Sequence, residues 1–317
     1  MAYRGFEPLR NRRRGDIVES VVRRKFRIGL AAAVLILMAL VPVFIAEGSV
    51  HGLRRRRPDP SYGDWVVRET GAAWKSVSVT APDGVRLEGW LFTPREPNGG
   101  VVMLLHGVND SRLGMIGHAP YLLRAGYKVL LPDSRNQGVS GGASMSYGIV
   151  EAADVHAWAD ELLRDRAIHR LYGLGASMGG AILIQSLAKE PRFQALVADS
   201  TFDTFENVAY YRLERASGLG RWASWPVAQA GFVYVRWRYG VDLTRASPMA
   251  AISVTRTPIL LIHGLGDINT PPSESEHLHD LNPAATSLWL VPGAVHVSAL
   301  GTCPEEYARR VLDWFGK

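Results

Sequence analysis

Cysteine is nearly absent from this sequence of 317 residues, and internal repeats and low-complexity tracts are absent from residue 58 onward. The single cysteine, Cys303, cannot pair within the chain, which excludes an internal disulfide framework and a zinc site built from cysteines. Hydrophobic residues make up 47% of the chain and charged residues 21%, proportions that exclude a collagen and a chain disordered throughout. The sequence therefore predicts one large globular domain with a packed apolar core.

The larger part of the chain also lacks an excess of basic charge. Residues 1–57 hold 13 of the 36 Lys and Arg but only 4 of the 30 Asp and Glu, which leaves 23 basic and 26 acidic side chains beyond them. A protein that binds nucleic acid needs its basic residues on the folded surface, where they meet the phosphates. This distribution argues against a nucleic-acid partner.

Residues 28–46, IGLAAAVLILMALVPVFIA, lack any charged side chain. At 1.5 Å per residue, a helix of this segment is about long enough to cross a hydrocarbon core of roughly 30 Å. We predict a transmembrane signal anchor here, with a basic cytoplasmic tail over residues 1–27 and a linker over residues 47–63. The positive-inside rule places the amino terminus in the cytoplasm and the domain over residues 64–317 outside it. The cations before the segment are Arg4, Arg10, Arg12, Arg13, Arg14, Arg23, Arg24, Lys25 and Arg27, and those after it are Arg54, Arg55, Arg56 and Arg57.

Two other interpretations of the apolar segment stay open. The small residues Ala46 and Gly48 could form a signal-peptidase site, and Arg-Arg-Lys-Phe at residues 23–26 resembles a twin-arginine export motif, so the segment could be a cleaved signal. It could also form a buried hydrophobic hairpin. Its length favours the anchor, because the apolar run is long for a signal peptide.

From residue 64 to residue 317, short apolar runs alternate with segments of helical period. Residues 75–80 and 85–93 alternate apolar with polar residues and predict an antiparallel hairpin at a sheet edge. The later strands are predicted at 101–105, 128–132, 170–175, 195–199, 258–264 and 287–293, and the helices at 113–125, 149–164, 178–189, 272–281 and 304–315. Nearly continuous apolar strands alternating with helices predict an α/β domain, with a mostly parallel sheet covered on both faces. Residues 202–250 interrupt this alternation, and we expect them to form a helical lid.

The segment Gly175-Ala176-Ser177-Met178-Gly179 follows a predicted buried strand and opens a predicted helix. This is the setting of a G-x-S-x-G nucleophile elbow, a sharp turn in which glycines flank a strained serine. The serine then stands at a helix amino terminus, where free N–H groups face developing negative charge. We therefore expect Ser177 to be a nucleophile, with the N–H groups of Val108 and Met178 forming the oxyanion hole.

A serine hydroxyl needs a histidine to accept its proton and a carboxylate to orient that histidine. Asp267 follows the strand at 258–264, and His296 follows the last strand, so the chain order is Ser, Asp, His. Asp199, at the end of the strand before the insertion, is the alternative acid. His106 and His263 are interpreted as loop-shaping hydrogen-bond partners.

Further segments carry a family resemblance: LLHG at 104–107, PDSRNQGVSGG at 132–142, YGIVEAADV at 147–155 and ASPMAAI at 246–252. Together with the elbow, they make residues 75–315 resemble the α/β-hydrolases, in particular the monoacylglycerol-lipase-like, BEM46-like and S33-type aminopeptidase serine hydrolases. The resemblance implies the α/β-hydrolase fold and a serine hydrolase activity. Asn136 and Gln137 depart from the family pattern, in which Gly and a His-like residue are common.

We predict a membrane-anchored serine hydrolase that cleaves carboxylic esters with an apolar or lipid-derived acyl group. The aromatic lid residues Trp222, Trp225 and Trp237 are expected to contact this small-molecule substrate. No cofactor or metal is expected, since His277 and His279 lie two residues apart and would point to different faces of a helix. Two alternatives stay open, a serine peptidase or aminopeptidase and a catalytically silent binding module on the same fold.

Overall fold

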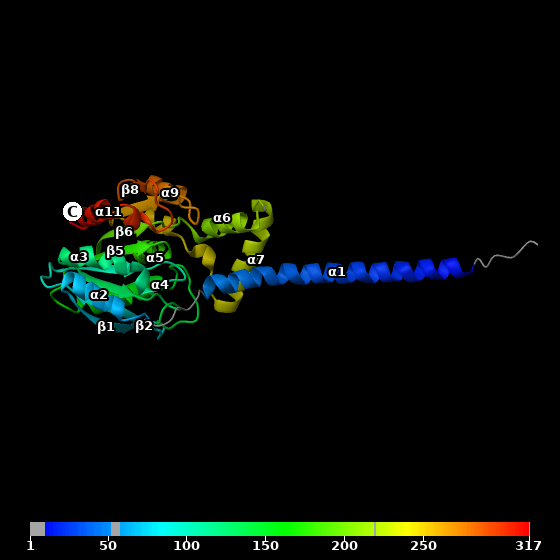
Figure 1. Ribbon diagram of the computed structural model, residues 1–317, viewed down its shortest axis with the longest axis horizontal. Helices are drawn as coiled ribbons and strands as arrows, with labels where there is room; N and C mark the ends of the chain where they lie inside the picture. The colour runs from blue at the N-terminus through cyan, green and yellow to red at the C-terminus, as the bar shows by residue number, and fades with distance from the viewer. Residues whose placement is uncertain (1–9, 52–57, 219, 317) are drawn as a thin grey trace, which may run out of the picture.

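The computed structural model describes residues 10–51, 58–218 and 220–316. This part of the chain folds around an eight-stranded sheet in the order β1-β2-β4-β3-β5-β6-β7-β8 (Figure 1). The strands are β1 (Ala73–Thr80), β2 (Arg86–Thr93), β3 (Gly100–Leu105), β4 (Lys128–Pro132), β5 (Arg170–Ala176), β6 (Phe193–Asp199), β7 (Ile259–Gly264) and β8 (Thr286–Val291). Each strand overlaps a predicted one, and the predicted hairpin is β1 and β2.

The sheet is antiparallel at one edge and parallel elsewhere. β1 pairs antiparallel with β2, β2 pairs antiparallel with β4, and every later pairing is parallel. β3 and β7 are buried at every residue, as their nearly continuous apolar sequences predict. Because parallel strands all point the same way, their carboxyl ends meet at one edge of the sheet, where open α/β sheets place their sites.

Helices cover both faces of the sheet, as predicted. The α-helices are α1 (Arg10–Val50), α2 (Ser61–Thr70), α3 (Ala119–Arg124), α4 (Glu151–Leu163), α5 (Met178–Ser186), α6 (Phe205–Ser217), α7 (Arg221–Tyr239), α8 (Pro248–Ile252), α9 (Ser273–Leu281), α10 (Ala299–Thr302) and α11 (Pro304–Phe315), with 3₁₀ helices η1 (Arg112–His118) and η2 (Leu243–Arg245). Buried side chains of α2, α3 and α11 pack in one apolar cluster, and those of α4, α5 and α9 pack in the other. The predicted helix at 113–125 is in fact η1 followed by α3.

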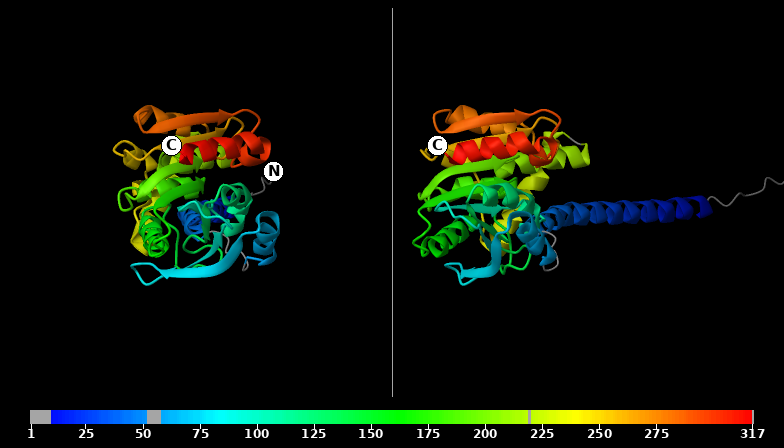
Figure 2. Two further views of the ribbon diagram at one scale, coloured as in Figure 1. Left: turned by 90° about the vertical axis from the view of Figure 1, so that its left-hand side faces the viewer. Right: turned by 60° about the vertical axis from the view of Figure 1, so that its left-hand side comes forward.

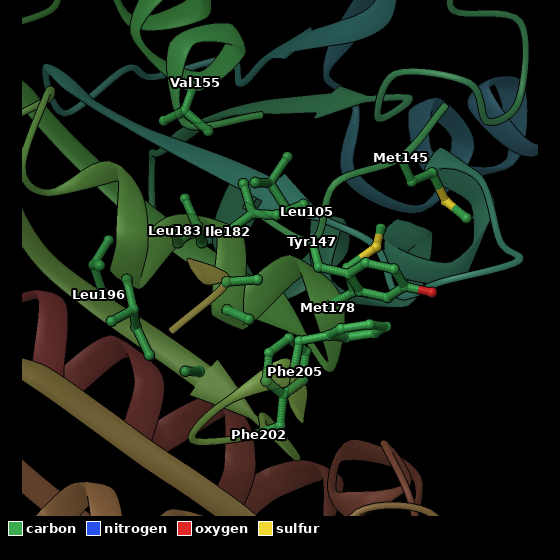
Figure 3. Close-up of a cluster of buried hydrophobic side chains, with 14 of the residues drawn as sticks. Leu105, Met145, Tyr147, Val155, Met178, Ile182, Leu183, Leu196, Phe202 and Phe205 are labelled. Carbon is green, nitrogen blue, oxygen red and sulfur yellow. The ribbon is translucent and has the colours of Figure 1, made fainter. Parts of the chain in front are cut away.

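The apolar cluster on the α4 and α5 side continues toward the insertion. Figure 3 shows Leu105 of β3, Val155 of α4 and Ile182 of α5 within it. Tyr147 and Phe205 carry the cluster beyond the sheet, with ring centroids 3.9 Å apart. Since Phe205 is the first residue of α6, the insertion packs on the same core as the sheet helices.

The insertion is helical, as predicted, and consists mainly of α6 and α7. Thr204 caps α6 by accepting a hydrogen bond from the Asn207 N–H, and Gly218 ends it with a positive φ of 66°. α7 crosses α1 where that helix meets the body of the protein (Figure 1). The lid therefore packs on the amino-terminal helix as well as on the core.

α1 is a single helix that projects from the body (Figure 2) and contains the whole predicted membrane segment, residues 28–46. In the part of the chain that the structure describes, it is the one helix long and apolar enough to cross a membrane. It begins inside the predicted tail, at Arg10, while residues 1–9 of that tail lie outside the described residues. The structure thus has an apolar amino-terminal helix whose length and composition suit either a membrane anchor or a signal sequence.

The linker predicted over residues 47–63 is wrong at both ends. Residues 47–50 continue α1, and Ser61 begins α2; the four arginines 54–57 lie outside the described residues. α2 forms because its apolar face has a partner: Val66 is fully buried, and Gly63 lies directly against the Trp74 ring of β1. Residues 61–70 are polar on average, so the sequence analysis missed the apolar face of this short helix.

The last turn of α1 is attached to the body by specific hydrogen bonds. The Val50 carbonyl accepts from the Met145 N–H at 2.8 Å and from the Asn136 side-chain amide at 3.1 Å. The Tyr147 hydroxyl donates to the Ser49 carbonyl at 2.8 Å. The final carbonyls of a helix have no partner within it, so these bonds satisfy groups that would otherwise be left without one.

Candidate active site

Ser177 occupies the sharp turn between β5 and α5. Its φ of 52° and ψ of −115° are strained for a residue with a side chain, as a nucleophile elbow requires. The flanking glycines are needed for space: a Cβ on Gly175 would lie 2.3 Å from the Gly179 carbonyl carbon, and one on Gly179 would lie 2.1 Å from the Leu105 carbonyl oxygen. The turn therefore presents the Ser177 hydroxyl at the amino terminus of α5.

The structure brings Ser177, His296 and Asp267 together at the carboxyl edge of the sheet. The Ser177 Oγ lies 3.0 Å from His296 Nε2, and His296 Nδ1 lies 2.6 Å from the Asp267 Oδ2. His296 stands in the loop after β8 and Asp267 in the loop after β7, 119 and 90 residues beyond the serine in the chain. In this arrangement Nδ1–H donates to the carboxylate and Nε2 is free to accept from the serine hydroxyl.

The Asp267 carboxylate is held by four donors. Its Oδ1 accepts from the backbone N–H groups of Asn269 at 2.8 Å and Thr270 at 3.0 Å, and its Oδ2 faces both His296 and His263, the latter at 3.2 Å. Burial raises the pKa of Asp267, but the hydrogen bonds from His263 and His296 outweigh it and hold the pKa well below its usual range. The carboxylate is therefore charged at neutral pH.

His263 supports the acid, a contact that the sequence analysis missed. Its Nε2–H points to the Thr270 carbonyl at 2.9 Å as well as to Asp267, and its Nδ1 accepts from the Ser275 hydroxyl at 2.7 Å. The spacing in the sequence could have indicated this contact, because His263 lies near the end of β7 and Asp267 follows four residues later. His106 has the loop-shaping position expected of it: its Nε2 accepts from the Ser134 N–H at 3.0 Å.

Asp199, the alternative acid, makes no direct hydrogen bond to His296. Its Oδ1 accepts from the Ser200 hydroxyl at 2.9 Å, and the Ser200 Oγ in turn accepts from the Val297 N–H at 3.1 Å. Asp199 therefore contacts the histidine loop through one intermediate residue. Burial raises the pKa of Asp199 to about 6.

A pocket of about 660 Å³ opens over Ser177 and His296. Val108 lines it, and Met178, the other residue expected to supply an oxyanion N–H, begins α5 directly after the serine. From the lid, Arg212 and Arg215 of α6 contribute to its wall. The volume is in the range of small-molecule sites, and the wall combines apolar groups with a few charges.

The lid tryptophans do not line this pocket, which corrects their predicted role. The exposed fractions of Trp222, Trp225 and Trp237 are 83%, 53% and 79%. The reason is helical periodicity: α7 buries the face that carries Ala228 and Val235, Trp222 and Trp237 lie on the opposite side of the helix, and Trp225 lies at the edge of the buried face. Aromatic composition alone could not tell these two faces apart.

Comparison with known proteins agrees with this fold. The model of the family described as "alpha/beta hydrolase fold" matches residues 100–223. The uncharacterized protein YqkD of Bacillus subtilis is 28% identical over 236 residues, which are 73% of this chain and 75% of that protein. The uncharacterized peptidase YuxL of the same organism is 25% identical over 281 residues, 80% of this chain but 40% of that protein.

Among solved structures, the Pyrococcus furiosus esterase Pf2001 superimposes with a TM-score of 0.68 at 24% identity, over 84% of this chain and all of that chain. The sheet order, the elbow and these matches define an α/β-hydrolase fold. The solved structures that share this fold with the chain include esterases.

Proposed function

We propose that this protein is a membrane-anchored serine hydrolase that cleaves carboxylic esters with an apolar acyl group. The observation that carries the proposal is the chain of hydrogen bonds from Ser177 through His296 to Asp267, at the floor of a pocket. Similarity to the fold of an esterase supports the ester class. The reaction needs no group other than water, the substrate and these side chains.

In the first half of the reaction, the Ser177 Oγ attacks the ester carbonyl carbon while His296 Nε2 takes the serine proton. The carbonyl oxygen gains the negative charge, and the N–H groups of Val108 and Met178 are proposed to donate to it. The bond to the alcohol oxygen then breaks, and His296 gives its proton to that oxygen. Alcohol leaves, and the acyl group remains on the serine.

In the second half, water attacks the acyl carbon and His296 takes one of its protons. The bond to Ser177 breaks, the histidine returns the proton to the serine oxygen, and the carboxylic acid is released. Throughout, Asp267 keeps the His296 proton on Nδ1 and stabilises the imidazolium that forms in both halves. The four donors around Asp267 fix the carboxylate for this role.

We propose further that residues 28–46 are a retained anchor and that the catalytic domain, residues 64–317, lies outside the cytoplasm. Retention is supported by Ala46 and Val50, which are buried in the apolar core, and by Glu47, whose carboxylate accepts from the Tyr234 and Tyr239 hydroxyls. Orientation is supported by the nine cations before residue 28. A reporter that is active only outside the cytoplasm should be active when fused to the carboxyl terminus.

The experiment for the chemistry is covalent labelling of the full chain in detergent with a fluorophosphonate. We expect labelling of the parent, none of Ser177→Ala, and full labelling of the matched control Ser253→Ala, an exposed serine after α8. Ester turnover should fall by several orders of magnitude in Ser177→Ala alone. An unlabelled parent would favour the silent binding module, and equal labelling of Ser177→Ala would refute the nucleophile.

One relative favours a second candidate, a serine peptidase, because YuxL is described as an uncharacterized peptidase. The two candidates share the nucleophile and differ in the leaving group, an alcohol or an amine. Paired p-nitrophenyl esters and p-nitroanilides with the same acyl group separate them. A higher kcat/KM on aminoacyl anilides than on fatty acyl esters would select the peptidase.

A further inference from the structure

An apolar cavity of about 330 Å³ lies between the end of α1 and the lid helices α6 and α7. The last turns of α1 form one wall, including Ile45 and Ala46. Leu213 of α6 and Val235 of α7 are among the residues opposite. Apart from one serine, one tyrosine and one arginine, every residue that lines this cavity is apolar. A cavity of this lining suits a hydrocarbon chain better than water.

This cavity adjoins the pocket over Ser177. Arg212 and Ala216, one turn apart on α6, line both spaces. The Arg212 guanidinium also donates to the Asn269 carbonyl at 3.1 Å, in the loop that carries Asp267. Arg212 and Ala216 therefore stand at the boundary between the apolar cavity and the pocket over Ser177.

The cavity also lies at the level where α1 would leave a membrane. A hydrocarbon core of about 30 Å corresponds to about 20 helical residues. Counted from Arg27, the last cation before the apolar run, that core ends near residue 47. The cavity-lining residues Pro42 and Ala46 are therefore at hydrocarbon depth. α7 reaches the same depth, since a Cβ on Gly231 would lie 3.6 Å from the Pro42 carbonyl oxygen.

The outer face of α7 has the composition of an interfacial helix. Trp222, Trp225, Val233 and Trp237 are exposed, and at 100° per residue they fall on one side of the helix. Arg236, near the carboxyl end of α7, is exposed and falls on the same side of the helix. Tryptophan and arginine side by side are typical of helices in the headgroup region. The indoles excluded from the catalytic pocket thus have a place against lipid.

We propose that the last turns of α1 do more than anchor the enzyme: they form a wall of the acyl-chain site, and the substrate is a lipid ester that enters this site from the membrane. The acyl chain would occupy the cavity between α1, α6 and α7, and its ester group would reach Ser177 past Arg212 and Ala216. The inference rests on the proposed esterase function and names its substrate class.

The first test compares two substitutions of equal size on α1. Ala46→Leu adds bulk to the cavity wall, whereas Ala32→Leu adds the same bulk to an exposed position of the membrane segment. The readout is the ratio of kcat/KM for p-nitrophenyl decanoate to that for p-nitrophenyl acetate, measured on each variant. We expect Ala46→Leu to lower this ratio about tenfold, the effect of expelling roughly two methylene groups, and Ala32→Leu to leave it unchanged. An unchanged ratio in Ala46→Leu overturns the proposal.

The second test needs no turnover. Ser177→Ala in lipid vesicles is exposed to a fatty acyl ester that carries a photoreactive diazirine at the chain end, and the crosslinked peptides are identified. Crosslinks in residues 42–50 and in α6 or α7 support the acyl site, and crosslinks confined to other segments overturn it. If the parent fails to react with fluorophosphonate while these crosslinks form, the esterase function fails and the lipid site stands.

Discussion

Replacing Asp267 by asparagine tests the role of one atom, the Oδ2 that faces His296, because the neighbouring N–H groups determine how the new amide would lie. Two backbone N–H groups, from Asn269 and Thr270, point at Oδ1. They require an acceptor there, so the amide oxygen takes the Oδ1 position and the amide nitrogen takes the Oδ2 position. The NH₂ group then faces His296 Nδ1, where the carboxylate oxygen was at 2.6 Å.

An NH₂ group can only donate, so His296 Nδ1 must become an acceptor and the ring proton moves to Nε2. That proton would point at the Ser177 Oγ, 3.0 Å away, and the ring could no longer take the serine proton. Loss of the correct tautomer costs about 10⁴ in kcat in serine hydrolases of this kind, or about 5.4 kcal/mol of transition-state stabilisation. We expect a fall of that size in Asp267→Asn.

The assay is kcat on p-nitrophenyl butyrate for the full chain in detergent, with the melting temperature recorded for each variant. The matched control is Asp199→Asn, whose amide oxygen can still accept from the Ser200 hydroxyl. We expect that control to stay within about tenfold of the parent, since it leaves the His296 tautomer unchanged. A larger loss in Asp199→Asn than in Asp267→Asn would refute the assignment of the acid.

Two further predictions concern stability and the membrane. Burial raises the pKa of Asp199 to about 6, so the folded state binds this proton more tightly than the unfolded state; the stabilisation is complete below about pH 4 and is lost as the pH rises through 6. An asparagine at this position cannot ionise, so the variant does not lose this stabilisation as the pH rises. The melting temperature of Asp199→Asn relative to that of the parent should therefore be several degrees higher at about pH 7.5 than at about pH 4.5. An equal difference at the two pH values would contradict the argument. Brominated lipids should quench Trp222, Trp225 and Trp237, so replacing all three by Phe should remove most of the quenching, while Trp158→Phe, a buried residue, should not change it.

The parts of this structure that the sequence could predict depend on neighbours in the chain. β3 and β7 are nearly continuous apolar runs, and a strand buried on both faces allows few other compositions. The elbow at Ser177 needs glycines two residues away on each side, because backbone atoms fill the space that a side chain would occupy. The chain order of Ser177, Asp267 and His296 then indicated which polar residues to place at one sheet edge.

The parts that could not be predicted depend on contacts between distant segments. Asn136 departs from the family pattern; it has a positive φ of 59°, which asparagine tolerates, and its side chain donates to the Val50 carbonyl, 86 residues away. Nothing within residues 132–142 indicates that partner. The prediction for the lid tryptophans failed for a similar reason, because the contacts of α7 with α1 and α6 decide which face of α7 is buried. The contact of His263 with Asp267 joins residues only four apart in the chain. It was missed because His263 was interpreted only as a loop-shaping hydrogen-bond partner.

The attachment of α1 changes how the anchor must act. If residues 47–63 were a flexible tether, the domain would sample all orientations near the membrane, and the anchor would raise only the local concentration of substrate. In the structure the domain binds α1 before the connecting segment begins, through the bonds to Ser49 and Val50 and through α7. If α1 is the membrane anchor that we propose, packing and not the length of residues 51–60 would fix the orientation of the pocket relative to the bilayer. The proposed lipid ester would then meet the cavity in one register, with its acyl chain along α1 and its ester group toward Ser177, and the anchor would contribute to orientation as well as to proximity.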